Sequence, residues 1–368
     1  MSQDKVSARL LTTAVFITGI LVFLALPFLP GRPKQHVVRP VKISLHSEEP
    51  NEPNEPNEPN EPNEPNEPNE RFLVAFGDSY SRSGFRTNYT YIRTGPGVHD
   101  MQRTERPKGD RVDAPSALNP IGNPALPGNT SSGGYNWATY MTTEFNSTLT
   151  LAYIFARSAS VVDAEIIPSR SKSSFSFAQQ IVHFQDTIGH RPHYAAWTAK
   201  NIVATVWFGF NDLSVVSHKR GQAAVLAAAN RRIFELSQIL YDTGIRNFAF
   251  IEVPPKELFP SHQAHKSNDT HHSYEMVSYA VNRWNSLLRQ NTVRFRKAHP
   301  DAKVTNVEIW DIFYEAFLRP QDLGAPNSTC VDPSGKGCLW ANTGHPGEEI
   351  HKLIGARVAE KAWGKAAM

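Results

Sequence analysis

A serine that follows an apolar run is the first candidate for chemistry in this chain. The sequence Phe-Gly-Asp-Ser-Tyr at 76–80 comes directly after apolar residues 72–75, a pattern typical of a buried strand that delivers a nucleophile to the edge of a sheet. Gly77 permits a tight turn that a side chain would obstruct. Asp78 and Ser79 are good helix-starting residues, so we expect Ser79 to lie beside a helix N-terminus that favours a developing negative charge. A lone Gly-Asp-Ser is more often an ordinary connection.

Three further stretches contain residue types that catalysis by a serine requires. Residues 207–212 (Trp-Phe-Gly-Phe-Asn-Asp) follow a second apolar run at 202–206, and we expect them at the same edge of the sheet. Residues 343–346 (Thr-Gly-His-Pro) precede a helical pattern near the C-terminus. Residues 132–137 (Ser-Gly-Gly-Tyr-Asn-Trp) place a glycine pair before an amphipathic segment.

These residue types are suited to ester hydrolysis. A serine hydroxyl is a weak nucleophile near neutral pH, and the neutral imidazole of His345 can take its proton and return it to a leaving alcohol. Attack on an ester creates an oxyanion, which needs preorganised hydrogen-bond donors. Taken singly, Asn211 suits a turn, Gly134 a helix cap and His345 the exposed start of a helix. As a set in this order, they favour catalysis.

The four stretches resemble the GDSL, or SGNH, hydrolases, whose second name gives Ser, Gly, Asn and His in that order. Shorter phrases resemble the fungal carbohydrate acetylesterase branch, and the resemblance covers about residues 71 to 365. They are Asn-Pro at 123–124, Thr-Ser-Ser-Gly-Gly at 130–134, Leu-Tyr at 240–241, Gly-Ile-Arg-Asn-Phe at 244–248 and Val-Pro-Pro at 253–255. The resemblance implies an α/β fold, a three-layer flavodoxin-like sandwich with a five-stranded parallel sheet.

The resemblance also implies a serine esterase with Ser79 as nucleophile and His345 as base. Its oxyanion hole would consist of the backbone N–H groups of Ser79 and Gly134 and the side-chain amide of Asn211. We expect short-chain esters, in the first place acetyl esters of sugars or cell-wall polysaccharide, and neither a cofactor nor a metal. Two alternatives stay open: a weak or inactive carbohydrate-binding relative, and a lipase-like esterase for longer acyl chains.

The chain departs from the family pattern at two places. The usual glycine pair is replaced by Ala-Arg-Ser-Ala at 156–159, whose side chains would narrow the cleft or redirect its specificity. The usual Asp three residues before the histidine is Asn342, which can accept the imidazole N–H but carries no charge to stabilise the cation. We therefore expect a slow Ser79–His345 dyad assisted by Asn342, with Asp332 as the alternative carboxylate.

The hydrophobic pattern agrees with an α/β fold. Two amphipathic stretches, at 223–242 and 274–296, predict helices. Apolar runs separated by helical patterns predict parallel strands with helices on both faces of the sheet. These runs lie at 72–76, 149–155, 202–208, 248–253 and 304–309. Ligands bind at the carboxyl ends of such strands, where we expect Ser79 and Asn211.

The N-terminal part has a different composition. We divide the chain into a short tail (1–9), an uncharged apolar segment (10–31), a linker (32–70) and a hydrolase domain (71–368). A helix over 10–31 would reach about 30 Å, the thickness of a bilayer core. We therefore predict a transmembrane signal-anchor, and a cleaved signal peptide of a secreted protein is the alternative.

The linker ends in a low-complexity repeat. Residues 50–70 repeat Pro-Asn-Glu seven times. Proline at every third position discourages helix and sheet, and the repeated glutamate makes the segment repel itself, so we expect an extended stalk. Such a stalk would hold the enzyme away from a membrane or wall; a tract without function is the alternative.

Sequons and cysteines indicate the secretory pathway. Basic residues after the apolar segment favour a cytoplasmic domain, but we give more weight to five Asn-x-Ser/Thr sequons, which indicate a lumenal or extracellular one. The sequons are at Asn88, Asn129, Asn146, Asn268 and Asn327. Cys330 and Cys338 would bridge each other in such a compartment. The net charge of +3 is too small to imply a nucleic-acid partner, and the oligomeric state stays open.

Overall fold

Five parallel strands form the centre of the fold. The structure, a computed structural model, describes residues 69–97, 99–106, 113–171, 173–217, 219, 221–263 and 271–364. Within these ranges the main sheet has the order β4-β1-β5-β6-β7, and every neighbouring pair is parallel. The strands are β1 (Glu70–Gly77), β4 (Leu149–Ile154), β5 (Ile202–Trp207), β6 (Asn247–Ile251) and β7 (Lys303–Val307). Counted along the chain, this is the 2-1-3-4-5 order of flavodoxin-like folds, which confirms the predicted fold class.

All five predicted runs are strands, although their ends shift by a residue or two. The run predicted at 248–253, for example, ends as a strand at Ile251. Beyond this point the Val253 N–H donates to Oδ1 of Asn285 at 2.9 Å instead of to a neighbouring strand. Hydrophobicity marks which residues are buried, whereas the ladder of backbone hydrogen bonds decides where the strand ends.

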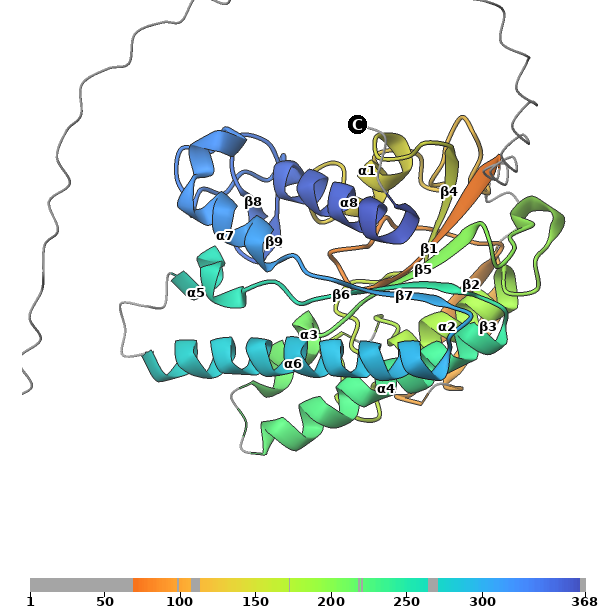
Figure 1. The fold of residues 1–368 in the computed structure, drawn as a ribbon, viewed down its shortest axis with the longest axis horizontal. Helices are drawn as coiled ribbons and strands as arrows, with labels where there is room; N and C mark the ends of the chain where they lie inside the picture. The colour runs from red at the N-terminus through yellow and green to blue at the C-terminus, as the bar shows by residue number, and fades with distance from the viewer. Residues whose placement is uncertain are drawn as a thin grey trace, which may run out of the picture. The chain divides into compact units, whose positions relative to one another are not determined.

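Helices cover both faces of the sheet (Figure 1). On one face α8 packs against α1 and α7 and contacts β6 and β7; on the other, α4 packs against α2 and α6. The first set is α1 (Trp137–Thr143), α7 (Trp310–Leu318) and α8 (Glu348–Trp363). The second is α2 (Phe177–Thr187), α3 (Phe210–Val216), α4 (Gln222–Asp242) and α6 (His271–Ala298). The three layers agree with the predicted sandwich.

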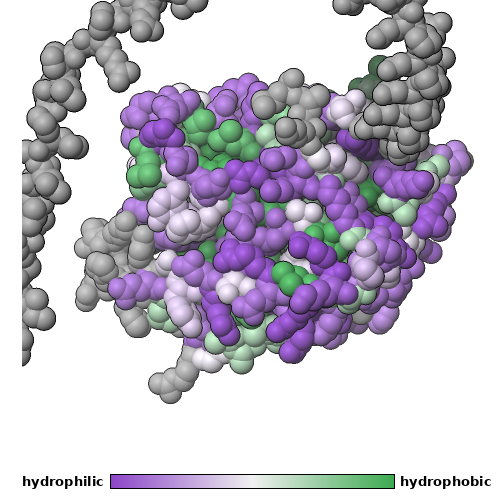
Figure 2. Space-filling model, in the orientation of Figure 1, coloured by the Kyte–Doolittle hydropathy of each residue, from purple (hydrophilic) through white to green (hydrophobic). Residues whose placement is uncertain are grey.

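The covering helices are amphipathic, as predicted for α4 and α6. The buried residues of α4 include Leu226, Ala229, Ile233 and Leu240, which recur at the spacing of one helix face. The exposed residues of α4 include Arg231, Glu235 and Asp242. Most of the surface in view in Figure 2 is hydrophilic, with hydrophobic residues in scattered groups. The core therefore lies between these helices and the sheet, whose first strand is almost wholly buried.

Two short hairpins stand outside the main sheet. One pairs β2 (Tyr89–Arg93) with β3 (Met101–Glu105), and the other pairs β8 (Trp340–Asn342) with β9 (His345–Pro346). Short helices complete the described part: α5 (Pro260–Gln263), η1 (His193–Ala195), η2 (Lys256–Leu258) and η3 (Pro320–Leu323). No sequence pattern indicated the second hairpin, which places Asn342 opposite His345.

Candidate active site

Ser79 lies in a tight turn at the carboxyl end of β1. The register pairs Gly77, the last residue of β1, with the last residue of β5, so both strands deliver their following segments to one edge of the sheet. The N–H groups of Ser81 and Arg82 donate to the Asp78 carbonyl at 3.1 and 3.0 Å. These bonds close a single turn around Ser79.

No helix follows Ser79, and our prediction of a helix N-terminus at this position is wrong. Gly84 has a φ of 77°, in the left-handed region, and a right-handed helix does not continue through this conformation. The Asp78 side chain caps only the one turn, by accepting a hydrogen bond from the Tyr80 N–H at 3.0 Å. Any stabilisation of negative charge at Ser79 therefore comes from local N–H groups and not from a helix dipole.

A buried glutamine fixes the backbone before the turn. Gln180 of α2 accepts from the Gly77 N–H at 3.0 Å and donates to the Gly77 carbonyl at 2.8 Å. A Cβ at Gly77 would lie 2.8 Å from Oγ of Ser81, which confirms that the turn has no room for a side chain. Sequence reasoning missed Gln180, because a single glutamine in an amphipathic segment carries no sign of its partner.

The β8–β9 hairpin brings His345 to Ser79. The Nε2 atom of His345 lies 2.7 Å from Oγ of Ser79. Its Nδ1 atom lies 2.8 Å from Oδ1 of Asn342. Three of the residues singled out in the sequence are therefore in one hydrogen-bonded row.

The contacts of Asn342 determine the tautomer of His345. The N–H of Gly344 can only donate, and it lies 3.0 Å from Oδ1 of Asn342, so this atom must be the amide oxygen and not the nitrogen. The Nδ1 atom of His345 then carries the hydrogen that this oxygen accepts. The lone pair of Nε2 is left facing Ser79, as a general base requires.

Burial keeps the histidine neutral. It lowers the pKa of His345 to about 4, with a smaller contribution from the charge of Arg82. In the part of the chain that the structure describes, no carboxylate contacts the ring, whose two nitrogens bond to Asn342 and Ser79. Asp332, the alternative carboxylate, instead accepts from the Ser334 N–H at 2.9 Å.

Tyr80 packs against the ring of His345. Its hydroxyl donates to the Gly344 carbonyl at 2.7 Å, and its ring centroid lies 5.2 Å from that of His345. Tyr80 is only 1% exposed. The residue that follows Ser79 therefore restricts the loop between Asn342 and His345, a role that only the tertiary contact reveals.

Two of the predicted oxyanion donors have free backbone N–H groups. Across the described ranges, no acceptor contacts the N–H of Ser79 or of Gly134. Their segments are tied together, because Nδ2 of Asn136 donates to the Arg82 carbonyl at 3.0 Å. The role of these two N–H groups in binding an oxyanion stays a prediction.

Glu348, the first residue of α8, packs against the glycine loop (residues 132–135). Its Oε1 accepts from the Tyr135 N–H at 2.7 Å, and a Cβ at Gly134 would lie 1.6 Å from the same oxygen. The N-cap of α1 is Asn136 and not Gly134. Glycine at position 134 therefore leaves room for the Glu348 carboxylate in this place and does not cap the helix.

Asn211 lies in the first turn of α3, with its amide already engaged. Its Nδ2 donates to Oδ2 of Asp78 and to the Ser160 carbonyl, both at 3.0 Å. An amide nitrogen carries two hydrogens, so donation to an oxyanion requires one of these bonds to be exchanged. The role of Asn211 as the third donor stays a prediction.

Three buried ionisable side chains surround the start of α3. Burial raises the pKa values of Asp78 and Asp212 and lowers that of Lys256. Lys256 donates to the Phe210 carbonyl at 3.1 Å, and Asp212 accepts from the Val162 N–H at 3.1 Å. Sequence reasoning gave no role to Asp212 or Lys256, because their partners are distant in the chain.

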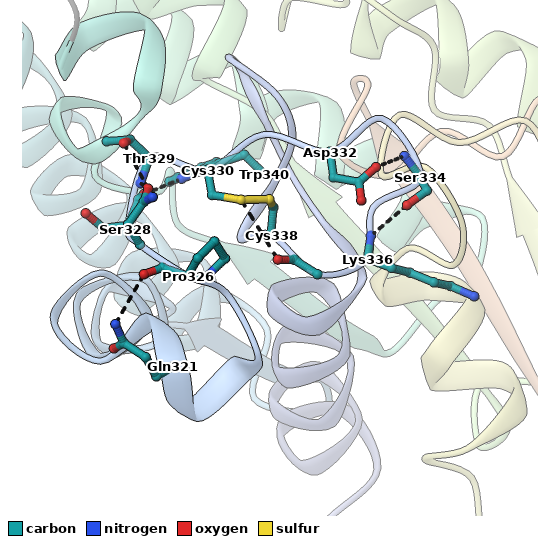
Figure 3. The surroundings of a disulfide bond; sticks show 12 residues. Gln321, Pro326, Ser328, Thr329, Cys330, Asp332, Ser334, Lys336, Cys338 and Trp340 are labelled. Atoms are coloured by element: carbon teal, nitrogen blue, oxygen red, sulfur yellow. Dashed lines mark hydrogen bonds between the residues drawn. A yellow bond between two sulfur atoms is a disulfide. The ribbon is translucent and has the colours of Figure 1, made fainter.

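Cys330 and Cys338 form a disulfide, as predicted (Figure 3), and their Cα atoms are 5.1 Å apart. The loop that they close contains Gly335, which packs against the glycine loop: a Cβ at Gly133 would lie 2.3 Å from the Gly335 nitrogen. The Gly335 carbonyl also accepts from the Glu348 N–H at 2.9 Å. The disulfide loop therefore contacts both the glycine loop and the start of α8.

Four of the five sequons lie among the described residues. Asn88, Asn129 and Asn327 are exposed. Asn146 is partly buried, and its amide nitrogen donates to a backbone carbonyl at 2.6 Å. Asn268 lies outside the described residues. Glycan attachment stays a prediction, which the exposure of three acceptors allows.

The predictions for the N-terminal part fall outside the described residues. They concern the tail (1–9), the apolar segment (10–31) and nearly all of the linker (32–70). No helix in the described part of the chain is long and apolar enough to cross a bilayer. In that same part, no group of three or more His, Cys, Asp or Glu side chains is placed to hold a metal ion.

Comparison with known proteins identifies the class to which this fold and site belong. The model of the GDSL-like lipase/acylhydrolase family matches residues 73–358, and the chain belongs to this family. This confirms the resemblance drawn from the sequence motifs. The chain is a carboxylic ester hydrolase.

Named relatives give a more particular likeness. The chain is 36% identical over 293 residues to an acetylesterase of Thermothelomyces thermophilus, which covers 80% of this chain and 88% of that protein. It is 29% identical over 145 residues to a GDSL esterase/lipase of Arabidopsis thaliana, covering 34% of this chain and 40% of the plant protein. Among solved structures, a catalytic mutant of an acetylxylan esterase from Geobacillus stearothermophilus is 11% identical, with a TM-score of 0.40 and coverage of 80% of this chain and 94% of that one.

Proposed function

We propose that the protein is a serine esterase that removes acetyl groups from sugars or cell-wall polysaccharide, with Ser79 as nucleophile and His345 as base. The observation that carries the proposal is the 2.7 Å contact between Oγ of Ser79 and Nε2 of His345. The likeness to the fungal acetylesterase supports the acetyl group. The carbohydrate acceptor rests on the resemblance to the carbohydrate acetylesterase branch.

The proposed reaction has two halves. In the first, Nε2 of His345 takes the Ser79 proton while Oγ attacks the ester carbonyl, and the N–H groups of Ser79 and Gly134 bind the oxyanion. Collapse breaks the bond to the alcohol, which receives the proton from His345, and leaves an acetyl-serine. In the second, His345 takes a proton from water, which attacks the acetyl-serine; the bond to Oγ breaks, acetate leaves, and His345 returns the proton to Oγ of Ser79.

Asn342 would make this enzyme slower than a triad with a carboxylate. Its Oδ1 holds the imidazole in the productive tautomer. It carries no charge to stabilise the imidazolium that forms when Ser79 loses its proton. This is also the reason to keep a weak or inactive carbohydrate-binding relative as the second candidate.

The chain-length dependence of hydrolysis tests the proposal. We expect kcat/KM for para-nitrophenyl esters to fall by about tenfold or more from acetate to octanoate, since discrimination between acyl chains reflects contacts made in the transition state. The measurement uses the purified full-length protein in detergent, with acetate release from an acetylated oligosaccharide measured in parallel. A rate that rises with chain length would support the lipase-like alternative instead, and no hydrolysis of any ester would support the binding protein.

The predicted topology gives a second, independent test. If residues 10–31 anchor the chain with its domain in the lumen, endoglycosidase treatment will increase its gel mobility, and carbonate will not extract it from membranes. Replacement of Asn88, Asn129 and Asn327 by Gln together should produce most of the same shift, because these acceptors are exposed. A freely soluble protein without glycans would contradict both parts, whereas a soluble glycoprotein would indicate a cleaved signal peptide.

A further inference from the structure

A cleft lined by arginines lies beside the candidate active site. It has a volume of about 300 Å³, and the described residues that line it include Arg82, Arg86, Arg106 and Arg157 and no acidic side chain. The positive charges of Arg82, Arg86 and Arg157 around one cleft repel one another unless an anion lies between them. The cleft is therefore unlike an ordinary surface, where charges of both signs alternate.

Among the described residues, three of these arginines have no ion-pair partner. The guanidinium of Arg157 donates within this set only to the neighbouring Ala156 carbonyl, at 3.3 Å. Arg82 donates to Oδ1 of Asn129 at 2.8 Å and more weakly to a backbone carbonyl, and its buried Nε has no partner. Arg86 is exposed and makes no side-chain hydrogen bond. No part of the inference depends on Arg106, which donates to the Thr87 carbonyl.

Arg157 stays charged in spite of this environment. Burial and the nearby charges of Arg106 and Arg82 lower its pKa to about 10, still well above neutrality. A partly buried guanidinium that keeps its charge is stabilised by any carboxylate that reaches it, because its planar fork matches the two carboxylate oxygens.

The cleft is joined to the nucleophile by two segments. The Arg157 N–H donates to the Gly77 carbonyl at 3.2 Å, two residues before Ser79. Arg82 follows Ser79 by three residues, and its positive charge contributes to the lowered pKa of His345. Arg157 also belongs to the stretch 156–159, which replaces the glycine pair that is usual in the family. A charged side chain therefore occupies a place where the family usually has no side chain.

We propose that this cleft binds a carboxylate carried by the ester substrate, through Arg82, Arg86 and Arg157, so that acidic esters are preferred to neutral ones. This inference rests on the proposed esterase function and adds a substrate class to it. The carboxylate is either on the alcohol, as in an acetylated sugar acid, or on the acyl group, as in a hemiester. In both cases the arginines bind one planar carboxylate of the same molecule whose ester bond Ser79 attacks.

Matched pairs of esters test the preference. For a carboxylate on the alcohol, para-acetoxybenzoate is compared with para-acetoxybenzamide. For one on the acyl group, para-nitrophenyl hemisuccinate is compared with para-nitrophenyl butyrate. We expect the charged-to-neutral ratio of kcat/KM to fall by about tenfold in Arg157→Gln, mainly through KM, and to fall less in Arg157→Lys. The pair that responds identifies where the carboxylate lies.

The controls separate this electrostatic effect from a general one. Arg283→Gln removes an exposed arginine of α6 and should leave the ratio unchanged. Salt should lower the ratio in the wild-type protein and lower it less in Arg86→Gln/Arg157→Gln, because ions screen exposed charges such as that of Arg86. If Arg157→Gln does not fold, Arg86→Gln at an exposed position replaces it, with a smaller expected loss.

A binding measurement distinguishes failure of this inference from failure of the proposed function. In a Ser79→Ala background, calorimetry with both pairs should show that in one of them the charged ester binds about tenfold more tightly than the neutral one, and Arg157→Gln should remove that difference. Equal affinities for the charged and neutral esters of both pairs, or a ratio unchanged in Arg86→Gln/Arg157→Gln, would overturn the arginine cleft while leaving the esterase intact. Loss of hydrolysis of every ester together with retained carboxylate binding would overturn only the esterase.

Discussion

Replacement of Ser79 by alanine is expected to lower kcat by roughly 10³-fold or more and to abolish labelling by a fluorophosphonate. Of the hydroxyls among the described residues, this is the one that lies 2.7 Å from Nε2 of His345. The variant leaves the turn intact, because that turn is closed by the Asp78 carbonyl and not by the Ser79 side chain. The measurement is turnover of para-nitrophenyl acetate by protein whose folding is checked by circular dichroism.

Ser83→Ala is the matched control for Ser79→Ala. Ser83 lies four residues further along, and its buried hydroxyl makes no hydrogen bond, so its loss should leave kcat within about twofold. Residual activity of Ser79→Ala above a few per cent of the wild-type rate would show that another group attacks the ester.

Replacement of Asn342 by aspartate is expected to raise kcat by at least about tenfold, equivalent to about 1.4 kcal/mol in the activation barrier. The reason is that Oδ1 of Asn342 already accepts from Nδ1 of His345 at 2.8 Å. The geometry for a triad therefore exists and only the charge is absent. A carboxylate in this place stabilises the imidazolium formed during attack, and KM should change little because Asn342 contacts the base and not the ester.

The pH dependence of the same variant provides a readout that a change in folding does not imitate. Burial lowers the pKa of His345 to about 4, so kcat/KM of the wild-type protein should rise with pH through about 4 and then level off. A negative charge at position 342 favours the protonated ring and raises this pKa. The acidic limb of the Asn342→Asp profile should therefore move to higher pH, by about one unit or more.

Asp332→Ala separates this interpretation from its alternative. Asp332 is engaged with the Ser334 N–H, so its loss should leave the acidic limb where it is. If Asn342→Asp changes neither kcat nor the limb while Asp332→Ala removes activity, the carboxylate of the triad is Asp332 and the dyad is wrong.

Local sequence patterns predicted the strands because an apolar run indicates a buried segment whatever its partners are. The five apolar runs became the five strands of the sheet, with ends displaced where side chains such as Asn285 take over the backbone hydrogen bonds. The pairing of Cys330 with Cys338 was predictable for a related reason, since both residues and the loop between them are close in the chain.

The turn after β1 shows where local reasoning fails. Asp78 and Ser79 favour a helix start, yet Gly84 adopts a left-handed conformation and the segment stays a single turn. Propensities describe what each residue tolerates, whereas the contacts of the segment that follows decide whether the turn is extended. The hydrogen bonds of Gln180 to the backbone of Gly77 are likewise tertiary contacts, between residues that are 103 positions apart.

The sequence by itself determined the candidates: a serine after a strand, a glycine pair, an asparagine and a histidine, in the order of one hydrolase family. Only the tertiary structure decided how they meet. The sheet register set Gly77 beside the end of β5, and the Gly344 N–H set which atom of the Asn342 amide faces His345. The arginine cleft unites residues from several separate segments of the chain. The physical reason is that residue type fixes which bonds a side chain can form, whereas the partner and its orientation depend on how the fold brings segments together, as it does for Ser79 and His345, which are 266 positions apart.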